Sequence, residues 1–183
     1  MASGKAGGTP QDRVDLILAH WARERPDLDA SPMEVPGRIL RGARYIDGAL
    51  DHVFKEFELD FGLFDVLAAL RRHGPPYQLA PSELNRWCML SSGAMTKRLD
   101  RLEGAGLVVR KSDPDDRRGI LVELVPAGLA LVDRVVEAHL ENERRILSPL
   151  SAAERRELAA LLRRVIIPLE RENGHEPAPP AGS

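Results

Sequence analysis

The stretch from Leu90 to Pro126 constrains the fold of this chain most, because a helix signal and a hairpin signal follow one another there. Ser91 or Ser92 can cap a helix by accepting a hydrogen bond from an unpaired amide of the first turn. Gly104 or Gly106 can end that helix, since glycine readily adopts the left-handed backbone found there. The sequence therefore predicts one helix between these two pairs of residues.

The apolar residues of this helix define its two faces. Met95, Leu99 and Leu102 recur at intervals of four and three residues, which places them on one stripe facing a core. Short hydroxyls and a lysine then face outward near the helix N-terminus, where they suit the phosphate oxygens and base edges of DNA. The outward residues are Ser92, Thr96, Lys97 and Asp100. An ordinary solvated face is the alternative.

A β-hairpin is predicted directly after the helix. Leu107–Val109 begins a strand, residues 112–116 have turn chemistry, and Ile120–Val125 resumes a β-rich run. An arginine on a protruding ribbon can enter the narrow minor groove while a neighbouring aspartate holds its guanidinium. The alternative is a salt bridge that only stabilises the tip. The charged residues of the tip are Asp113, Asp115, Asp116, Arg117 and Arg118.

A second, shorter helix precedes this unit. The run PSELNRWCM is typical of a helix from about Pro81 to Met89, with Leu84, Trp87 and Cys88 available for burial. Two helices joined by a tight turn and followed by a hairpin form a winged helix-turn-helix. The sequence thus predicts a mainly α fold with a small β-hairpin wing.

The run LSSGAMTKRLDRLEGAGLVVRKSDPDDRRGILVELVPAGLALVDRV resembles the recognition helix, wing and following helix of MarR-type transcriptional regulators. The wing of that family commonly contains DPxDRR, and its next helix opens with Pro-Ala-Gly or a similar triplet. One departure is Val125, where the family more often has a threonine that can cap this helix. The resemblance implies a regulator that binds double-stranded DNA. We assign DNA contact to Ser91, Ser92, Thr96, Lys97, Arg101, Asp116, Arg117 and Arg118.

Composition is compatible with this interpretation. The 183 residues, 43% hydrophobic and 30% charged, are enough for a real core, and we expect one domain. Because the net charge is −2, DNA affinity has to come from a local excess of basic residues. Seven basic and five acidic residues lie between Ser91 and Arg118. The rest of the protein is acidic and would discourage indiscriminate binding.

The sequence contains no motif typical of a metalloprotein, an enzyme or a membrane protein. Cys88 is the only cysteine, and no two histidines are three or four residues apart, so we expect no disulfide, metal or other cofactor. No nucleophile elbow, phosphate-binding glycine loop or HExxH is present, so we expect no enzyme. Without a long apolar run or a signal peptide, we expect a cytoplasmic protein. Cys88 is either a redox-sensing thiol or a buried small side chain.

The flanking segments are predicted to be helical. A helix over Gln11–Arg25 is closed by Pro26, and Pro36 suits the first turn of a long helix with a near-heptad apolar stripe. A further helix runs from Pro126 to about Leu147. Ser151 and Glu154 form a capping box for a last helix ending near Pro168, whose Leu158, Leu161, Leu162 and Val165 point inward.

Long apolar stripes on both sides of a small DNA-reading unit imply a homodimer. One recognition helix contacts too few base pairs to be selective, whereas a two-fold dimer reads two half-sites. We expect mobile tails (1–10 and 173–183), an extra N-terminal helix and connection (11–30), a dimerisation helix (31–58), a winged helix-turn-helix domain (59–125) and C-terminal dimerisation helices (126–172).

Arg98 borders the buried stripe of the recognition helix, because it lies three residues from Met95 and four from Leu102. A guanidinium in that position needs an anionic partner. Asp65, early in the helix FGLFDVLAAL, is the best candidate in the sequence.

The N-terminal extension HWARERPDLDASPMEVPGRILRGAR resembles the PecS-like, urate-responsive branch of the MarR family. In that branch a tryptophan on an added first helix, an aspartate and arginines bind urate or related purines. The resemblance implies a ligand site at Trp21, Asp65, Arg98 and Arg110. A planar anion that stacks on Trp21 and binds Arg98 would displace Asp65 and shift the recognition helix.

Three functional classes remain open at this point. The first is a DNA-binding repressor released by a planar anion such as urate. The second responds instead to a phenolic or lipophilic ligand, or to oxidation at Cys88. The third is a helical interaction module that binds no DNA.

Overall fold

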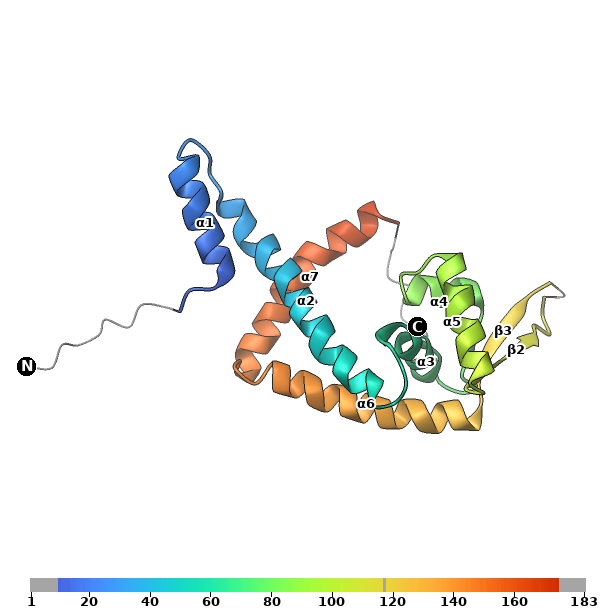
Figure 1. Ribbon diagram of the computed structural model, residues 1–183. Helices are drawn as coiled ribbons and strands as arrows, with labels where there is room; N and C mark the ends of the chain where they lie inside the picture. Colours follow the sequence, from blue (N-terminus) through green and yellow to red (C-terminus); the bar gives the residue numbers. More distant parts are fainter. Residues whose placement is uncertain (1–9, 117, 175–183) are drawn as a thin grey trace, which may run out of the picture. The chain divides into compact units, whose positions relative to one another are not determined.

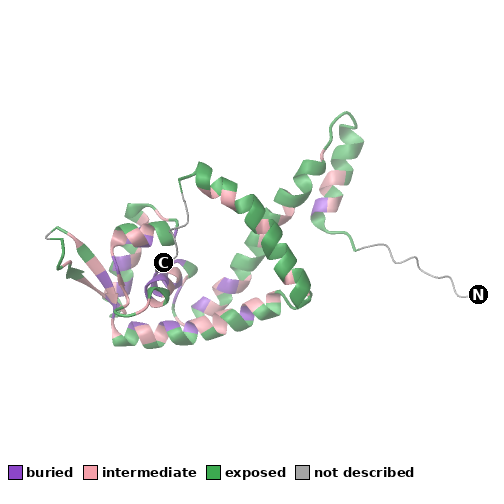
Figure 2. Ribbon diagram, turned by 180° about the vertical axis from the view of Figure 1, so that it is seen from behind, coloured by how far each residue is buried: buried purple, intermediate pink, exposed green. Residues whose placement is uncertain are grey.

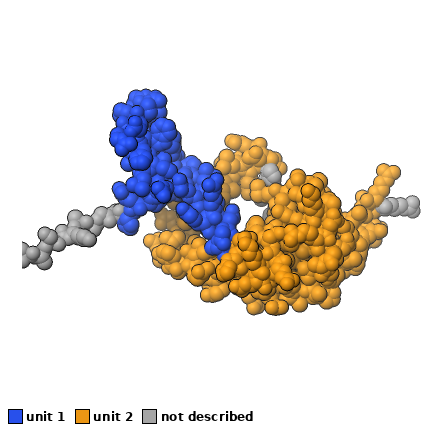
Figure 3. All heavy atoms as spheres, in the orientation of Figure 1, with its two compact units in different colours: residues 1–49 blue, residues 50–183 orange. Residues whose placement is uncertain are grey.

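The computed structural model describes residues 10–116 and 118–174. The chain clusters into two compact units, residues 1–49 and 50–183, shown in blue and orange in Figure 3. The boundary between the two units falls within the helix α2 (Glu34–Lys55). The two tails expected at the ends of the chain fall almost entirely outside the described residues.

The first unit holds a helix pair that is joined by ion pairs. The helix α1 (Arg13–Glu24) begins at Asp12, which forms a capping box with Asp15. After a short 3-10 helix (Ser31–Met33), α2 (Glu34–Lys55) brings Arg38 to both carboxylates, with Nε 2.9 Å from Asp12 and Nη2 2.6 Å from Asp15. The predicted helix over 11–25 is confirmed. Its two-aspartate cap was not anticipated, because only a folded α2 supplies the arginine.

The apolar stripe of α2 is only partly covered. Leu50 and Phe54, near its C-terminal end, are buried. Several large apolar side chains closer to its N-terminus are exposed, although Pro36 lies in the first turn as predicted. The exposed residues are Val35, Ile39, Leu40, Tyr45 and Ile46.

The second unit contains three short helices and a small sheet (Figure 1). The helices α3 (Phe61–His73), α4 (Pro81–Trp87) and α5 (Ser92–Gly104) pack against one another. The strands β2 (Val108–Ser112) and β3 (Ile120–Leu124) form the predicted hairpin, with Arg110 opposite Val122. A third strand, β1 (Gln78–Leu79), pairs antiparallel with β3, so the order is β1-β3-β2. The winged helix-turn-helix is thus confirmed, and β1 is an addition.

The core of this unit lies between α3, α5, the sheet and α6 (Pro126–Ile146). Met95, Leu99 and Leu102 of α5 are almost completely buried, which confirms the stripe predicted from their spacing. Phe54 stacks on Phe64 with ring centroids 4.7 Å apart. Figure 2 shows the buried residues concentrated in this part of the second unit.

Two expectations about side-chain burial and helix length are wrong. Trp87, expected to be available for burial, is 49% exposed in the last turn of α4, where only Arg72 Cζ, 5.6 Å from its ring centroid, lies over the ring among the described cations. The last helix, α7 (Ala152–Glu172), does not end near Pro168 but continues through it. Its N-terminal capping box of Ser151 and Glu154 is confirmed.

The apolar side chains of α7 are exposed within one chain rather than pointing inward. No residue of α7 is buried, and Figure 2 shows the helix almost entirely in the exposed colour. Leu158, Leu161 and Val165 are each between 43% and 50% exposed, and Leu162 is half-buried. In the described parts of the chain, no helix is both long enough and apolar enough to cross a membrane.

The start of α6 depends on a glycine rather than on a cap. Its N-cap residue, Val125, forms no side-chain cap, as its missing hydroxyl led us to expect. At Gly128 an added Cβ would collide with the carbonyl oxygen of Leu107 and lie 2.9 Å from the carbonyl carbon. The Leu107 carbonyl group belongs to the backbone and cannot change conformation as readily as a flexible side chain can.

We therefore expect Gly128→Ala to lower the free energy of unfolding by about 3 kcal/mol, as overpacking against an immobile group does. Gly104→Ala is the matched control, because an added Cβ there meets nothing within 4 Å. Urea denaturation should leave this control as stable as the parent protein or slightly more stable. Equal midpoints for both variants would contradict this account of Gly128.

Candidate DNA interface and effector site

The N-terminal half of α5 presents the polar face expected of a recognition helix. Ser91 caps the helix, with its Oγ accepting from the amide of Ala94 at 3.4 Å. Ser92, Thr96 and Lys97 are exposed, and the Thr96 hydroxyl donates to the carbonyl of Ser92 at 3.0 Å. These side chains point away from the core and are accessible to a groove of DNA.

The tip of the wing is organised by its aspartates. Asp113 accepts from the amide of Asp115, and Asp116 accepts from the amide of Arg118, both at 2.9 Å. Asp116 therefore shapes the turn through the backbone, a role that the sequence did not indicate. Arg118 is exposed at the tip, whereas Arg117 lies outside the described residues.

Arg110, at the base of the wing, joins β2 to α5. Its Nη1 lies 2.8 Å from Glu103 and its Nη2 lies 2.6 Å from Asp100, both on the recognition helix. Its amide also donates to Glu103 at 2.9 Å. The side chain is only 27% exposed, so solvent screens these contacts less than it screens a surface ion pair. Arg110 thus ties the wing to the helix and offsets part of the negative charge of Asp100 and Glu103.

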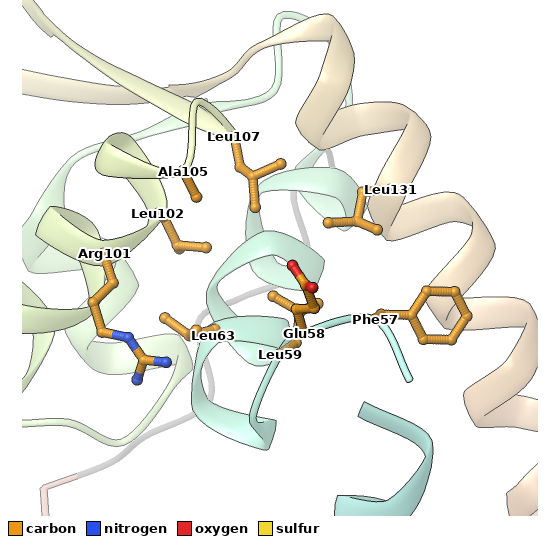
Figure 4. A pocket seen from close by; sticks show the side chains of 9 residues that line it. All are labelled: Phe57, Glu58, Leu59, Leu63, Arg101, Leu102, Ala105, Leu107 and Leu131. Carbon is orange, nitrogen blue, oxygen red and sulfur yellow. The ribbon is translucent and has the colours of Figure 1, made fainter. Parts of the chain in front are cut away.

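Arg101 does not share the exposed face of Ser92 and Thr96. Its Nη1 lies 2.8 Å from Asp60, the N-cap of α3. It borders a hollow of about 440 Å³ (Figure 4), around which leucines from α3, α5 and α6 gather. The lining residues are Phe57, Glu58, Leu59, Leu63, Arg101, Leu102, Ala105, Leu107 and Leu131. Arg101, assigned to DNA contact, thus already has a carboxylate partner at the surface, where its side chain is 61% exposed.

The expected pairing of Arg98 with Asp65 is not formed. Asp65 has Arg72 as its nearest cation, with Nη1 at 3.8 Å. Arg98 is half-buried, and within the described parts of the chain no carboxylate lies within 4 Å of its guanidinium. Instead the guanidinium lies against Gly62 of α3, one turn before Asp65. The sequence indicated which face Arg98 borders but not where along α3 it lies.

Sequence reasoning missed Arg72. It follows Asp65 by seven residues on α3, two helical turns later, so the same periodicity that assigned the core could have placed it on the face of Asp65. Its guanidinium lies over the ring of Trp87. Arg72, Asp65 and Arg98 all act electrostatically on Cys88, so the four side chains form one cluster between α3, α4 and α5.

Trp21, the remaining predicted ligand residue, belongs to the first unit. It lies on α1 and is 40% exposed, and its carbonyl accepts from the amide of Arg25 at 2.8 Å. The indole is therefore an accessible aromatic face rather than a core side chain.

A capped recognition helix, a three-stranded sheet with a protruding wing and a preceding helix define a winged-helix DNA-binding protein. Residues 63–119 match the family model described as the MarR family. The chain is 48% identical over 152 residues to the HTH-type transcriptional regulator PecS of Dickeya dadantii, covering 83% of this chain and 92% of PecS.

Solved structures agree with this match. A mutant MarR of Escherichia coli in complex with operator DNA aligns with a TM-score of 0.66 and 28% identity, over 75% of this chain and 99% of its own. BpsR of Bordetella bronchiseptica aligns with a TM-score of 0.63 and 28% identity, over 70% and 91% of the two chains. The chain belongs to the MarR family of DNA-binding, ligand-responsive transcriptional regulators. Its relatives are regulators and not enzymes, as predicted.

Cys88 is poorly suited to redox sensing. Its side chain is 8% exposed. Burial in the first place, and then the nearby Asp65 carboxylate, raise the pKa of its thiol to about 12. Because the thiolate is the reactive form, the protonated thiol should persist at any physiological pH.

We expect the folded protein to react with a disulfide reagent at pH 8 much more slowly than the unfolded protein does. With a pKa of about 12, the thiolate fraction at pH 8 is about one in ten thousand. Absorbance of the released thiol, with and without urea, measures the two rates. Labelling of the folded protein at the rate of a free cysteine would show that the thiol is not protected.

Proposed function

We propose that this protein is a cytoplasmic repressor that binds a pseudo-palindromic operator as a homodimer and is released by a planar anion such as urate or a related purine. The observation that carries the proposal is Arg98, a half-buried cation on the recognition helix with no carboxylate within 4 Å among the described residues. A buried guanidinium without a partner is costly, so an anion that reaches it binds with a gain.

The surroundings of Arg98 favour an anion further. Arg98 lies at the first turn of α3, where the unpaired amides of the helix carry partial positive charge. Arg72 adds a second guanidinium near Asp65. A planar anion can accept paired hydrogen bonds from a guanidinium, as a carboxylate does. On the resemblance of the N-terminal extension, we also assign Trp21 and Arg110 to the residues that bind the ligand.

The negative charge of such a ligand would act on the carboxylates around it. An anion bound at Arg98 would repel the nearby Asp65 carboxylate, whose nearest cation is Arg72, and would compete with Asp100 and Glu103 for Arg110. Because Arg98, Thr96 and Lys97 share one helix, a change at Arg98 moves the DNA face. A coupling of about 1 to 3 kcal/mol changes DNA affinity roughly 5 to 150 fold.

The homodimer is supported by the exposed apolar side chains of α2 and α7. Apolar faces of this length are normally covered in solution. A two-fold dimer would place its recognition helices in half-sites about 34 to 36 Å apart on one side of the duplex. Light scattering tests this directly, since the mass of one chain, 20.2 kDa, would exclude the dimer.

The alternatives of a phenolic effector or of oxidation at Cys88 are less well supported. The raised pKa of Cys88 disfavours oxidation. The DNA binding of BpsR is regulated by 6-hydroxynicotinic acid, a planar aromatic acid. That precedent favours a planar anion.

The wing provides a test of the DNA interface. Arg118→Ala should weaken operator binding, because it removes a cation from the exposed tip, and should lower the slope of log affinity against log salt by about one. Arg118→Lys is the matched control, because it keeps the charge and should keep the slope. Gel shifts on the DNA upstream of the gene, at several salt concentrations, give both quantities. An unchanged slope in Arg118→Ala would exclude a phosphate or groove contact.

The effector site is tested by adding urate or xanthine to the same gel shift. Millimolar urate should release the parent protein from DNA, whereas Trp21→Phe and Asp65→Ala should respond less at unchanged or slightly changed DNA affinity. Asp65→Asn is the matched variant, because it keeps the shape and removes the charge that the anion repels. If neither purine changes operator binding or melting temperature, the purine proposal is wrong. If Arg118→Ala loses the response to urate before Trp21→Phe and Asp65→Ala do, the assignment of Arg118 to DNA binding and of Trp21 and Asp65 to ligand binding is wrong.

A further inference from the structure

At Gly62, α3 contacts the recognition helix through the guanidinium of Arg98. A Cβ added at Gly62 would lie 2.6 Å from Nε of Arg98 and still closer to its Cζ and Nη2. Three atoms of one guanidinium at such short range mean that the group lies flat against the glycine. Gly62 is itself buried.

No other glycine in the described parts of the chain has an arginine against it. Gly93 and Gly104 of α5 face open space, Gly37 faces Val14, and Gly128 faces backbone. The obstacle at Gly62 is instead the far end of a flexible side chain. A methyl group there would be accommodated by moving Arg98 rather than by moving a helix.

We propose that Gly62 is a positioning residue of the effector site, because the missing side chain leaves the place in which the Arg98 guanidinium lies. This inference rests on the proposed binding of a planar anion at Arg98. A guanidinium donates its hydrogen bonds in its own plane. Covering one face with Gly62 therefore leaves the edge donors for an anion and fixes the plane in which that anion is bound.

The position also decides which charges Arg98 influences. Its charge lowers the pKa of the Asp60 carboxyl, although the amide of Leu63 and the Arg101 guanidinium do more. Its charge also acts on Cys88, together with Asp65 and Arg72. From Gly62, Arg98 thus reaches both the N-cap of α3 and the cluster around Asp65. A side chain at residue 62 would remove it from both.

The experiment is a double-mutant cycle of Gly62→Ala and Arg98→Ala, with Gly104→Ala as the control for adding a methyl group to a helix. Urate binding to the full-length protein is measured by calorimetry. Gly62→Ala should weaken urate binding about tenfold or more, as the loss of a charge-assisted pair does, whereas Gly104→Ala should bind like the parent. Parent-like binding by Gly62→Ala would overturn the inference while the proposed function stands.

Melting temperatures test the same contact without a ligand. Gly62→Ala should lower the melting temperature of the parent, because the added methyl group collides with the Arg98 guanidinium, and should raise it in the Arg98→Ala background, where alanine favours a helix over glycine. A decrease in both backgrounds, or an unfolded double variant, would show that Arg98 is not the obstacle and would overturn the inference. If the parent fails to bind urate while the melting temperatures invert as expected, the proposed effector is wrong but the contact of Gly62 with Arg98 stands.

Discussion

The burial of one stripe of α5 against the core is the interaction on which the rest of the second unit depends. Met95, Leu99 and Leu102 are nearly inaccessible, and together they fix the rotation of the recognition helix about its axis. With that rotation set, Ser92, Thr96 and Lys97 can only face outward, and Arg98 can only lie at the edge of the core. The surface offered to DNA and the half-buried cation are thus two consequences of the same packing, which explains how a ligand at one could affect the other.

Ion pairs set the charge of the recognition helix after packing has set its rotation. Arg110 offsets one of the two negative charges of Asp100 and Glu103, and Asp60 neutralises Arg101. The acidic residues of α5 therefore repel a phosphate backbone less than the sequence alone indicates. Lys97 and Arg98 are the cations of this helix without a carboxylate within 4 Å in the described parts of the chain, one on the exposed face and one at the edge of the core.

Periodicity and capping patterns predicted the helices well, because these signals are local. The stripe of α5, the capping box at Ser151 and the uncapped start at Val125 all agree with the structure. Features that depend on partners distant in the sequence were missed. The two-residue β1 has no pattern of its own and exists through its pairing with β3, and the position of Arg98 depends on which turn of α3 it meets. Pro168 was overestimated as a helix terminator, since the turns on either side of it stay helical.

The contacts of Arg110 join the wing and the recognition helix, so that the two elements move together. The Arg110 side chain donates hydrogen bonds to Asp100 and Glu103 of α5, and Arg110 itself belongs to β2, which leads to the tip of the wing. The hairpin therefore cannot move far relative to α5 without breaking charge-assisted hydrogen bonds. While these contacts hold, a displacement of the recognition helix carries the wing with it. A ligand that weakens these contacts of Arg110 would free the wing from the recognition helix.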